Sequence, residues 1–146
     1  WTLLVDTFYN EIHAHQVTKI PGNSQPYYYC LEQLKKRAGK KNEEQTPQVV
    51  FHTDQGSVYS SRGFFQAHEQ YNILRSMSRR ATPTDNPIVE ALNGWIKEEL
   101  FLDHGLATAE NVPALLDTYV HYFNYERPAA ALGYKSPVQY RTELGF

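Results

Sequence analysis

A single cysteine, Cys30, is present in the sequence, so no disulfide bond can form within the chain. This indicates a reducing compartment, and Cys30 is interpreted as a small core residue. The sequence also lacks an apolar run that could cross a bilayer, and its start lacks the features of a signal peptide. We therefore expect a cytoplasmic protein without membrane contacts. An initiator methionine is missing too, so we expect a trimmed domain or a missing upstream segment.

An excess of positive charge is also missing. The 146 residues include 14 Lys and Arg against 16 Asp and Glu, which gives a net charge of −2. This balance argues mildly against a protein that binds nucleic acid on its own, because such proteins usually carry a basic excess. The basic residues are uneven, however, since Arg75, Arg79 and Arg80 fall within one short stretch without an acid. An exposed basic turn is one interpretation of Arg79 and Arg80.

The hydrophobic pattern predicts one α/β domain over residues 1–146, with a helical C-terminal portion from about residue 108. Two short apolar runs at the start predict a β-hairpin, and the helical spacing that follows leads into another strand, which indicates a β-α-β crossover. The predicted strands cover residues 1–5, 12–17, 49–52 and 73–78. The predicted helices cover residues 27–38, Ser61 to about Tyr71, and stretches that begin at Pro87, at a Thr108 cap and at Ser136.

Asp54 stands where the apolar strand VVFH gives way to the breaking segment Gln-Gly-Ser. A carboxylate at the end of a buried strand is held on a rigid element and opens into a loop, which is how metal-binding and catalytic acids are often presented. The loop residues Gln55 and Ser57 follow it directly. Asp54 is therefore a candidate catalytic residue that needs a partner.

The helix predicted from Pro87 supplies a second carboxylate. Helical steps of three, four and seven residues place one polar set on a single side, away from the apolar stripe. The polar set is Asn86, Glu90, Asn93, Gly94 and Lys97, and the stripe is Val89, Leu92, Ile96 and Leu100. A solvent-exposed helix face would give the same pattern, so the pattern alone leaves both readings open.

Four blocks of the chain make the interpretation more specific. They are HTDQGSVYSS (52–61), SMSRR (76–80), TDNPIVEALNGWIKEELF (84–101) and YFNYERPAAALGYKSPVQY (122–140). In this order they resemble the blocks of the integrase-like (rve) catalytic core of bacterial insertion-sequence transposases. Each block is weak by itself, and the ordered set is specific. Relatives commonly have a His after the Arg-Pro of the last block, where this chain has Ala129.

The resemblance implies a ribonuclease-H-like mixed sheet flanked by helices. It also implies a metal-dependent enzyme that cleaves DNA 3′ ends and transfers strands in the bacterial cytoplasm, with Mg²⁺ or Mn²⁺ as cofactor. Its partners would be transposon ends and target DNA, with a homo-oligomer as the active complex and no small-molecule substrate. The implied metal ligands and catalytic residues are Asp54 and Glu90. The implied DNA contacts are Lys97, Asn86, Gln55, Ser57, Arg79 and Arg80.

The family uses three acids, and the chain shows no clear third one. Asp6 is the only early aspartate, but its segment resembles the family's second strand, where an Asp caps the hairpin turn. We therefore expect the first catalytic Asp to lie upstream of Trp1. We also expect this chain alone to be inactive or nearly so in strand transfer.

Two other functions are consistent with parts of the sequence. One is a ribonuclease-H-like nuclease that acts on RNA or DNA without transposition. The other is an inactive fragment that only dimerises or binds DNA. The segments around Arg127 and Ser136 resemble the transposase tail and argue against the nuclease, and we interpret the ERPAAALGYKSP block as a structural clasp.

Overall fold

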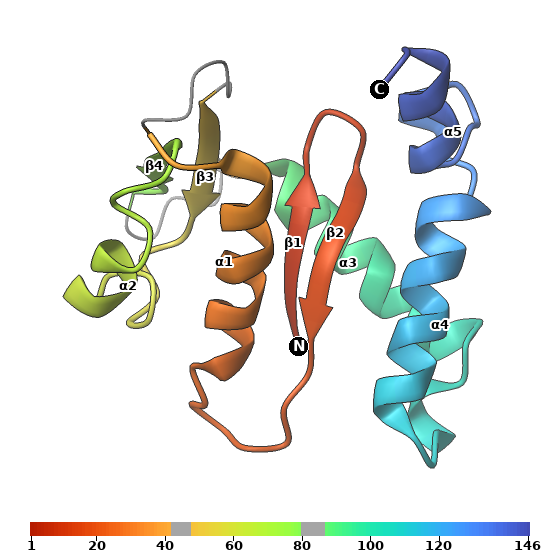
Figure 1. Cartoon of the computed structure of the whole chain (residues 1–146). Coiled ribbons are helices and arrows are strands. Elements are labelled where there is room, and N and C mark those ends of the chain that lie inside the picture. The colour runs from red at the N-terminus through yellow and green to blue at the C-terminus, as the bar shows by residue number, and fades with distance from the viewer. Residues whose placement is uncertain (42–47, 80–86) are drawn as a thin grey trace. The chain divides into compact units, whose positions relative to one another are not determined.

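The computed structural model describes residues 1–41, 48–79 and 87–146 (Figure 1). Contacts within the chain divide it into two compact units. The first unit contains Trp1–Leu4 and Ala14–Asn86, and the second contains Val5–His13 and Pro87–Phe146. Helices and short strands are both present, which confirms the predicted α/β class. The expectation of a single domain stays a prediction.

The opening hairpin consists of β1 (Thr2–Asp6) and β2 (Glu11–Gln16) (Figure 1). At the end of β1, the Oδ1 atom of Asp6 accepts hydrogen bonds from the backbone N–H groups of Phe8 and Tyr9, at 2.8 and 2.9 Å. A short acidic side chain that captures the N–H groups two and three residues ahead closes the turn without help from the strands. Asp6 therefore caps the hairpin turn, as the sequence predicts.

The core of the first unit is built on α1 (Gln25–Ala38), which confirms the helix predicted over residues 27–38. The helix ends at Gly39, whose φ of 66° suits a residue without a side chain. The apolar face of α1 and the neighbouring strands form one buried cluster. Its members are Leu4, Ala14, Cys30, Leu34, Ala38 and Ile73.

The second sheet pairs β3 (Val49–Thr53) with β4 (Ile73–Met77) in parallel, with His52 opposite Ser76. The hydrogen-bonded strands of the described residues thus include a hairpin and a parallel pair. Parallel neighbours need a crossover, which here contains α2 (Arg62–Gln66). Because the strands run in the same direction, both C-terminal ends reach the same edge, where Asp54 follows one of them.

The helix predicted from Ser61 to about Tyr71 is shorter than expected. Its start is right, because Ser61 Oγ accepts a hydrogen bond from the backbone N–H of Phe64 at 3.2 Å. Its end at Gln66 has a local cause. The His68 ring nitrogen Nδ1 lies 2.7 Å from the carbonyl oxygen of Phe64, which a continuing α-helix would use for the backbone N–H of residue 68.

The second unit is built on α3 (Pro87–Leu102), α4 (Val112–Tyr125) and α5 (Pro137–Glu143), with 3₁₀ turns η2 (Leu106–Thr108) and η3 (Ala130–Leu132). The buried residues of α3 and α4 follow the predicted stripes. They are Leu92, Ile96 and Leu100 on α3, and Leu116, Tyr119 and Phe123 on α4. In the part of the chain that the structure describes, no helix is long and apolar enough to cross a membrane.

The helix caps of this unit confirm one prediction and correct another. Ser136 and Gln139 form a reciprocal capping box at the start of α5, as the Ser-Pro signal predicts. Thr108, however, does not cap α4, because it belongs to η2. The cap is Asn111, whose Oδ1 atom accepts a hydrogen bond from the backbone N–H of Ala114 at 3.1 Å.

Candidate functional site

Asp54 is exposed immediately after the buried end of β3, Thr53. Its Oδ1 atom accepts a hydrogen bond from the backbone N–H of Gly56 at 2.8 Å. A Cβ atom at position 56 would lie only 2.9 Å from the same oxygen, so a side chain there would force the carboxylate to shift. The other carboxylate oxygen, Oδ2, receives no hydrogen bond from the described residues. Asp54 is therefore oriented by its own loop and keeps one oxygen available for a ligand.

The two loop residues predicted to contact DNA, Gln55 and Ser57, are also exposed. They flank Gly56, so the three residues present a short stretch of accessible backbone beside the Asp54 carboxylate. The loop is closed on itself by Ser60, whose hydroxyl donates to the carbonyl oxygen of Gln55 at 3.1 Å. The structure thus brings Asp54, Gln55 and Ser57 together in one loop of the first unit.

A histidine beneath this loop connects the two parallel strands. The ring nitrogens of His52 lie 2.9 Å from the hydroxyl oxygens of Ser76 and Ser78, with Nδ1 facing Ser76 and Nε2 facing Ser78. The backbone N–H of Ser78 also donates to the carbonyl oxygen of Thr53 at 2.9 Å. The sequence analysis singled out both motifs that contain these residues, but it did not predict that they touch. The contact follows from the parallel register of β3 and β4, which places His52 opposite Ser76.

Glu90 lies in the first turn of α3, where a negative charge is favoured by the helix dipole. Its side chain is exposed, as are those of Asn93 and Lys97, so these members of the predicted polar face lie on the exposed side of the helix. Among the described residues, neither Glu90 nor Lys97 has an ion-pair or hydrogen-bond partner. These exposed side chains are able to bind a charged ligand. An ordinary solvent-exposed helix face would have the same composition.

The remaining predicted DNA contacts are Arg79, Arg80 and Asn86. Arg79 is exposed and follows Ser78 after the end of β4. Asn86 and Arg80 lie outside the described residues. Asp54 belongs to the first unit and Glu90 to the second.

The donor chemistry of the two carboxylates fits a hard divalent cation. Mg²⁺ prefers carboxylate oxygens and keeps several waters, so it needs few protein ligands. Within residues 1–41, 48–79 and 87–146, no group of three or more His, Cys, Asp or Glu side chains forms a ready metal cluster. Each of the two carboxylates offers oxygen ligands of the type that such an ion prefers.

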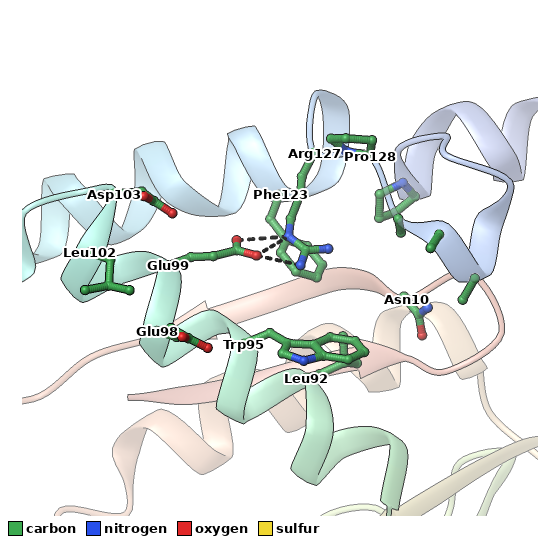
Figure 2. A pocket seen from close by; sticks show the side chains of 14 residues that line it. Asn10, Leu92, Trp95, Glu98, Glu99, Leu102, Asp103, Phe123, Arg127 and Pro128 are labelled. Atoms are coloured by element: carbon green, nitrogen blue, oxygen red, sulfur yellow. Dashed lines mark hydrogen bonds and ion pairs between the residues drawn. The ribbon is translucent and has the colours of Figure 1, made fainter.

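A second constellation that sequence reasoning missed is centred on Glu99 of α3. Arg127 Nε donates to both carboxylate oxygens of Glu99 at 2.7 and 2.9 Å (Figure 2). The Tyr119 hydroxyl donates to Oε2 of the same carboxylate at 2.8 Å. Burial raises the pKa of Glu99, but the hydrogen bonds from Arg127 and Tyr119 outweigh it, so the pKa is lowered overall. Burial and this carboxylate together raise the pKa of Tyr119. The ERP segment is therefore a clasp that joins α4 to α3.

A pocket of about 410 Å³ lies beside this clasp, within the second unit (Figure 2). Its walls come from α3, the end of α4 and the segment that contains η3. Trp95 and Leu102 on its α3 side are largely exposed, and Glu98 and Asp103 add negative charge. Because the nearby acids would repel phosphate, the pocket is a poor candidate for a nucleic-acid contact.

Comparison with known proteins agrees with this picture. Residues 71–137 match the family model described as "Integrase core domain". The chain is 31% identical over 138 residues to an uncharacterized transposase-like protein of Haemophilus influenzae, which covers 94% of this chain and 61% of that relative. It is 28% identical over 141 residues to a putative transposase for insertion sequence element IS150 of Escherichia coli, with 96% and 47% covered. The chain thus spans about half the length of the curated relatives it matches.

Solved structures show the same fold at low sequence identity. The simian T-cell lymphotropic virus intasome, solved in complex with the PP2A regulatory subunit B56 gamma, contains a chain that matches with a TM-score of 0.72 and 22% identity. This match covers 92% of the present chain and 45% of that one. The catalytic core domain of BIV integrase matches with a TM-score of 0.68 and 18% identity, over 96% and 83% of the two chains.

The fold is therefore that of a ribonuclease-H-like, retroviral-integrase-type core. Together with the sequence relatives, it supports an integrase-like core similar to those that insertion-sequence transposases carry.

Proposed function

We propose that this chain is the catalytic core of a transposase that cuts the 3′ ends of its element and joins them to target DNA, with Mg²⁺ or Mn²⁺ as cofactor. The observation that carries the proposal is Asp54. It directly follows strand β3 in the segment that resembles the family's motif, its carboxylate is oriented by Gly56, and one oxygen remains available. Glu90 provides the second acid on the exposed face of α3.

Asp54 and Glu90 are assigned as the metal ligands, since both present exposed carboxylates on regular elements or directly beside them. A divalent cation supplies charge neutralisation at the phosphodiester oxygens. Lys97 lies two turns after Glu90 on the same helix face and is assigned to a DNA phosphate. The other proposed DNA contacts are Gln55, Ser57, Arg79, Arg80 and Asn86, of which Arg80 and Asn86 lie outside the described residues.

The proposed reaction has two displacement steps. Water attacks the phosphorus at the element's end, the bond to the flanking DNA breaks, and a free 3′-OH is left on the element. That 3′-OH then attacks a phosphodiester of the target, and a target 3′-OH leaves. Because two ends must be joined to one target, the proposed active complex is a homo-oligomer on DNA.

The test is Mn²⁺ binding to this chain by calorimetry, alone and with Asp54→Asn, Glu90→Gln or Asp6→Asn. The expected result is weak binding that is lost in the first two variants and kept in the third, because the Asp6 carboxylate already serves the hairpin turn. Binding that survives both Asp54→Asn and Glu90→Gln would overturn the proposal.

A comparison of two substrates distinguishes the nuclease alternative. A DNA duplex that carries the element's terminal sequence and an RNA–DNA hybrid would be offered to the intact parent protein with Mn²⁺. A transposase core is expected to act on the DNA end and to produce joined products. Cleavage of the hybrid without joined products would support the nuclease instead.

A further inference from the structure

We infer that His52 is a positioning residue, which holds the end of β3 against β4 so that Asp54 leaves the strand in one fixed direction. The inference concerns a residue that makes no proposed contact with metal or DNA. It rests on the proposed role of Asp54, and it concerns what keeps that carboxylate in place.

The first step of the argument is the geometry of the bridge. The two ring nitrogens of His52 each lie 2.9 Å from a serine hydroxyl of the neighbouring strand segment, at Ser76 and at Ser78. These serines are two residues apart, so they project from the same side of an extended strand. A one-residue slip between the strands would break both contacts, and the bridge therefore locks the register.

The second step is the position of the bridge relative to Asp54. His52 precedes Asp54 by two residues, and the carbonyl oxygen between them, on Thr53, accepts the backbone N–H of Ser78 at 2.9 Å. Ser78 therefore holds the end of β3 twice, through its hydroxyl and through its backbone. Beyond this point the chain enters the exposed loop, where the Asp54 carboxylate bonds the Gly56 N–H.

The third step concerns the chemistry of the bridge. A serine hydroxyl both donates and accepts, so the pair of serines satisfies a neutral imidazole in either tautomer. Both nitrogens of His52 are occupied, which leaves neither to bind a metal ion. The ring is half-buried and Ser78 is buried, so the contacts are shielded from competing water. These properties suit an orienting role.

The first measurement is the backbone ¹⁵N order parameter of Gly56 in the metal-free chain, which reports on the loop that Asp54 closes. His52→Ala is expected to lower it from a rigid value of about 0.85 to below about 0.6. Ser76→Ala combined with Ser78→Ala is expected to do the same. The second measurement is Mn²⁺ affinity, which we expect to fall about tenfold in both variants, as for other residues that orient a metal ligand.

Conservative replacements separate the two contacts. The amide of glutamine reaches about as far as Nε2, and that of asparagine about as far as Nδ1. His52→Gln can therefore keep the contact with Ser78, and His52→Asn the contact with Ser76. Because the backbone N–H of Ser78 also holds the carbonyl oxygen of Thr53, directly before Asp54, we expect Gln to restore the Gly56 order parameter and the Mn²⁺ affinity more fully than Asn.

The matched control is Val49→Ala, at the other end of β3. Val49 packs against the core of the first unit and has no part in the bridge. The Val49→Ala variant is expected to have a lower melting temperature, while Gly56 stays rigid and the Mn²⁺ affinity is unchanged. If Val49→Ala loosened Gly56 as much as His52→Ala does, or if His52→Ala left Gly56 and Mn²⁺ affinity unchanged, the inference would be wrong.

Failure of the proposed function gives a different result. If Asp54→Asn left Mn²⁺ affinity unchanged, Asp54 would not be a metal ligand. The order parameter of Gly56 would still show whether His52 fixes the loop, because that measurement needs no metal.

Discussion

Asn124 of α4 holds both backbone groups of Ile12 in β2. Its Oδ1 atom accepts the Ile12 N–H at 2.9 Å, and its Nδ2 group donates to the Ile12 carbonyl oxygen at 2.8 Å. All of these groups are buried, and the two residues are far apart in the sequence. The Asn124 side chain therefore forms the two hydrogen bonds that a neighbouring strand would otherwise form with Ile12 of β2.

This relationship predicts a large effect on stability. Asn124→Ala leaves the buried N–H and carbonyl groups of Ile12 without partners, so it is expected to lower the free energy of unfolding by about 3 kcal/mol. Urea denaturation would measure the loss. The control is Asn93→Ala on the exposed face of α3, where a change of less than about 0.5 kcal/mol is expected. A similar small effect for both variants would contradict the prediction.

Asp6 gives a prediction about pH. His13, whose Nε2 atom lies 3.9 Å from Asp6 Oδ2, lowers the pKa of Asp6. Burial opposes this, and the N–H groups of Tyr9 and Phe8 lower the pKa further, so that it lies below the usual 3.8. A lowered folded-state pKa means that the ionised form stabilises the fold above the unfolded pKa. This contribution is lost as the pH falls through the lower folded value.

The measurement is the free energy of unfolding of the wild type and of Asp6→Asn at a series of pH values. The wild type is expected to be the more stable above pH 4, and the difference is expected to shrink as the pH falls below 3.8. Carboxyl NMR titration of Asp6 would check the pKa directly. A difference that stays constant over this range would show that the ionised carboxylate does not stabilise the turn.

The Glu99 clasp predicts that arginine cannot be replaced by lysine at position 127. Arg127 presents two N–H groups to one carboxylate, and a lysine ammonium cannot reproduce this planar arrangement. Arg127→Lys is therefore expected to lower the melting temperature, by about half as much as Arg127→Gln. Arg141, which contacts Glu11 through Nε at 2.6 Å, offers a more exposed comparison. Equal stability of Arg127→Lys and the wild type would refute the prediction.

Lys97 gives a prediction about DNA binding. Lys97→Gln is expected to weaken binding to any DNA sequence and to reduce the slope of log K against log salt by about 1, because one phosphate contact is lost. Fluorescence anisotropy at several salt concentrations measures the slope. The control is Lys36→Gln in the last turn of α1, where the basic residues suit the helix dipole. An unchanged slope for Lys97→Gln would remove this residue from the DNA interface.

Much of the fold follows from local sequence signals. The Ser-Pro start of α5, the apolar stripe of α3 and the turn cap at Asp6 each depend on residues within a few positions of one another, and each was predicted correctly. The two errors arose where a side chain competes with a simple signal. His68 takes the carbonyl that would continue α2, and Asn111 displaces Thr108 as the cap of α4.

The contacts between distant elements could not be predicted from local sequence signals. His52 meets Ser76 only because β3 and β4 pair in one register, and Glu99 meets Arg127 only because α3 packs against α4. Such contacts join residues more than 20 positions apart. Periodicity within one element carries no information about them. The motifs could therefore be recognised in the sequence, whereas the reason why they occur together became visible only in the structure.

The close approach of Gly56 to Asp54 also bears on how this loop can vary. A side chain at position 56 would need the space that the Asp54 carboxylate oxygen occupies, at 2.9 Å from the first carbon atom. The acceptability of a residue at one position thus depends on which residue is present at the other. A side chain at position 56 would displace the Asp54 carboxylate oxygen from its present place and disturb its hydrogen bond to the backbone N–H of residue 56. The orientation of the carboxylate and the absence of a side chain two residues later are therefore coupled.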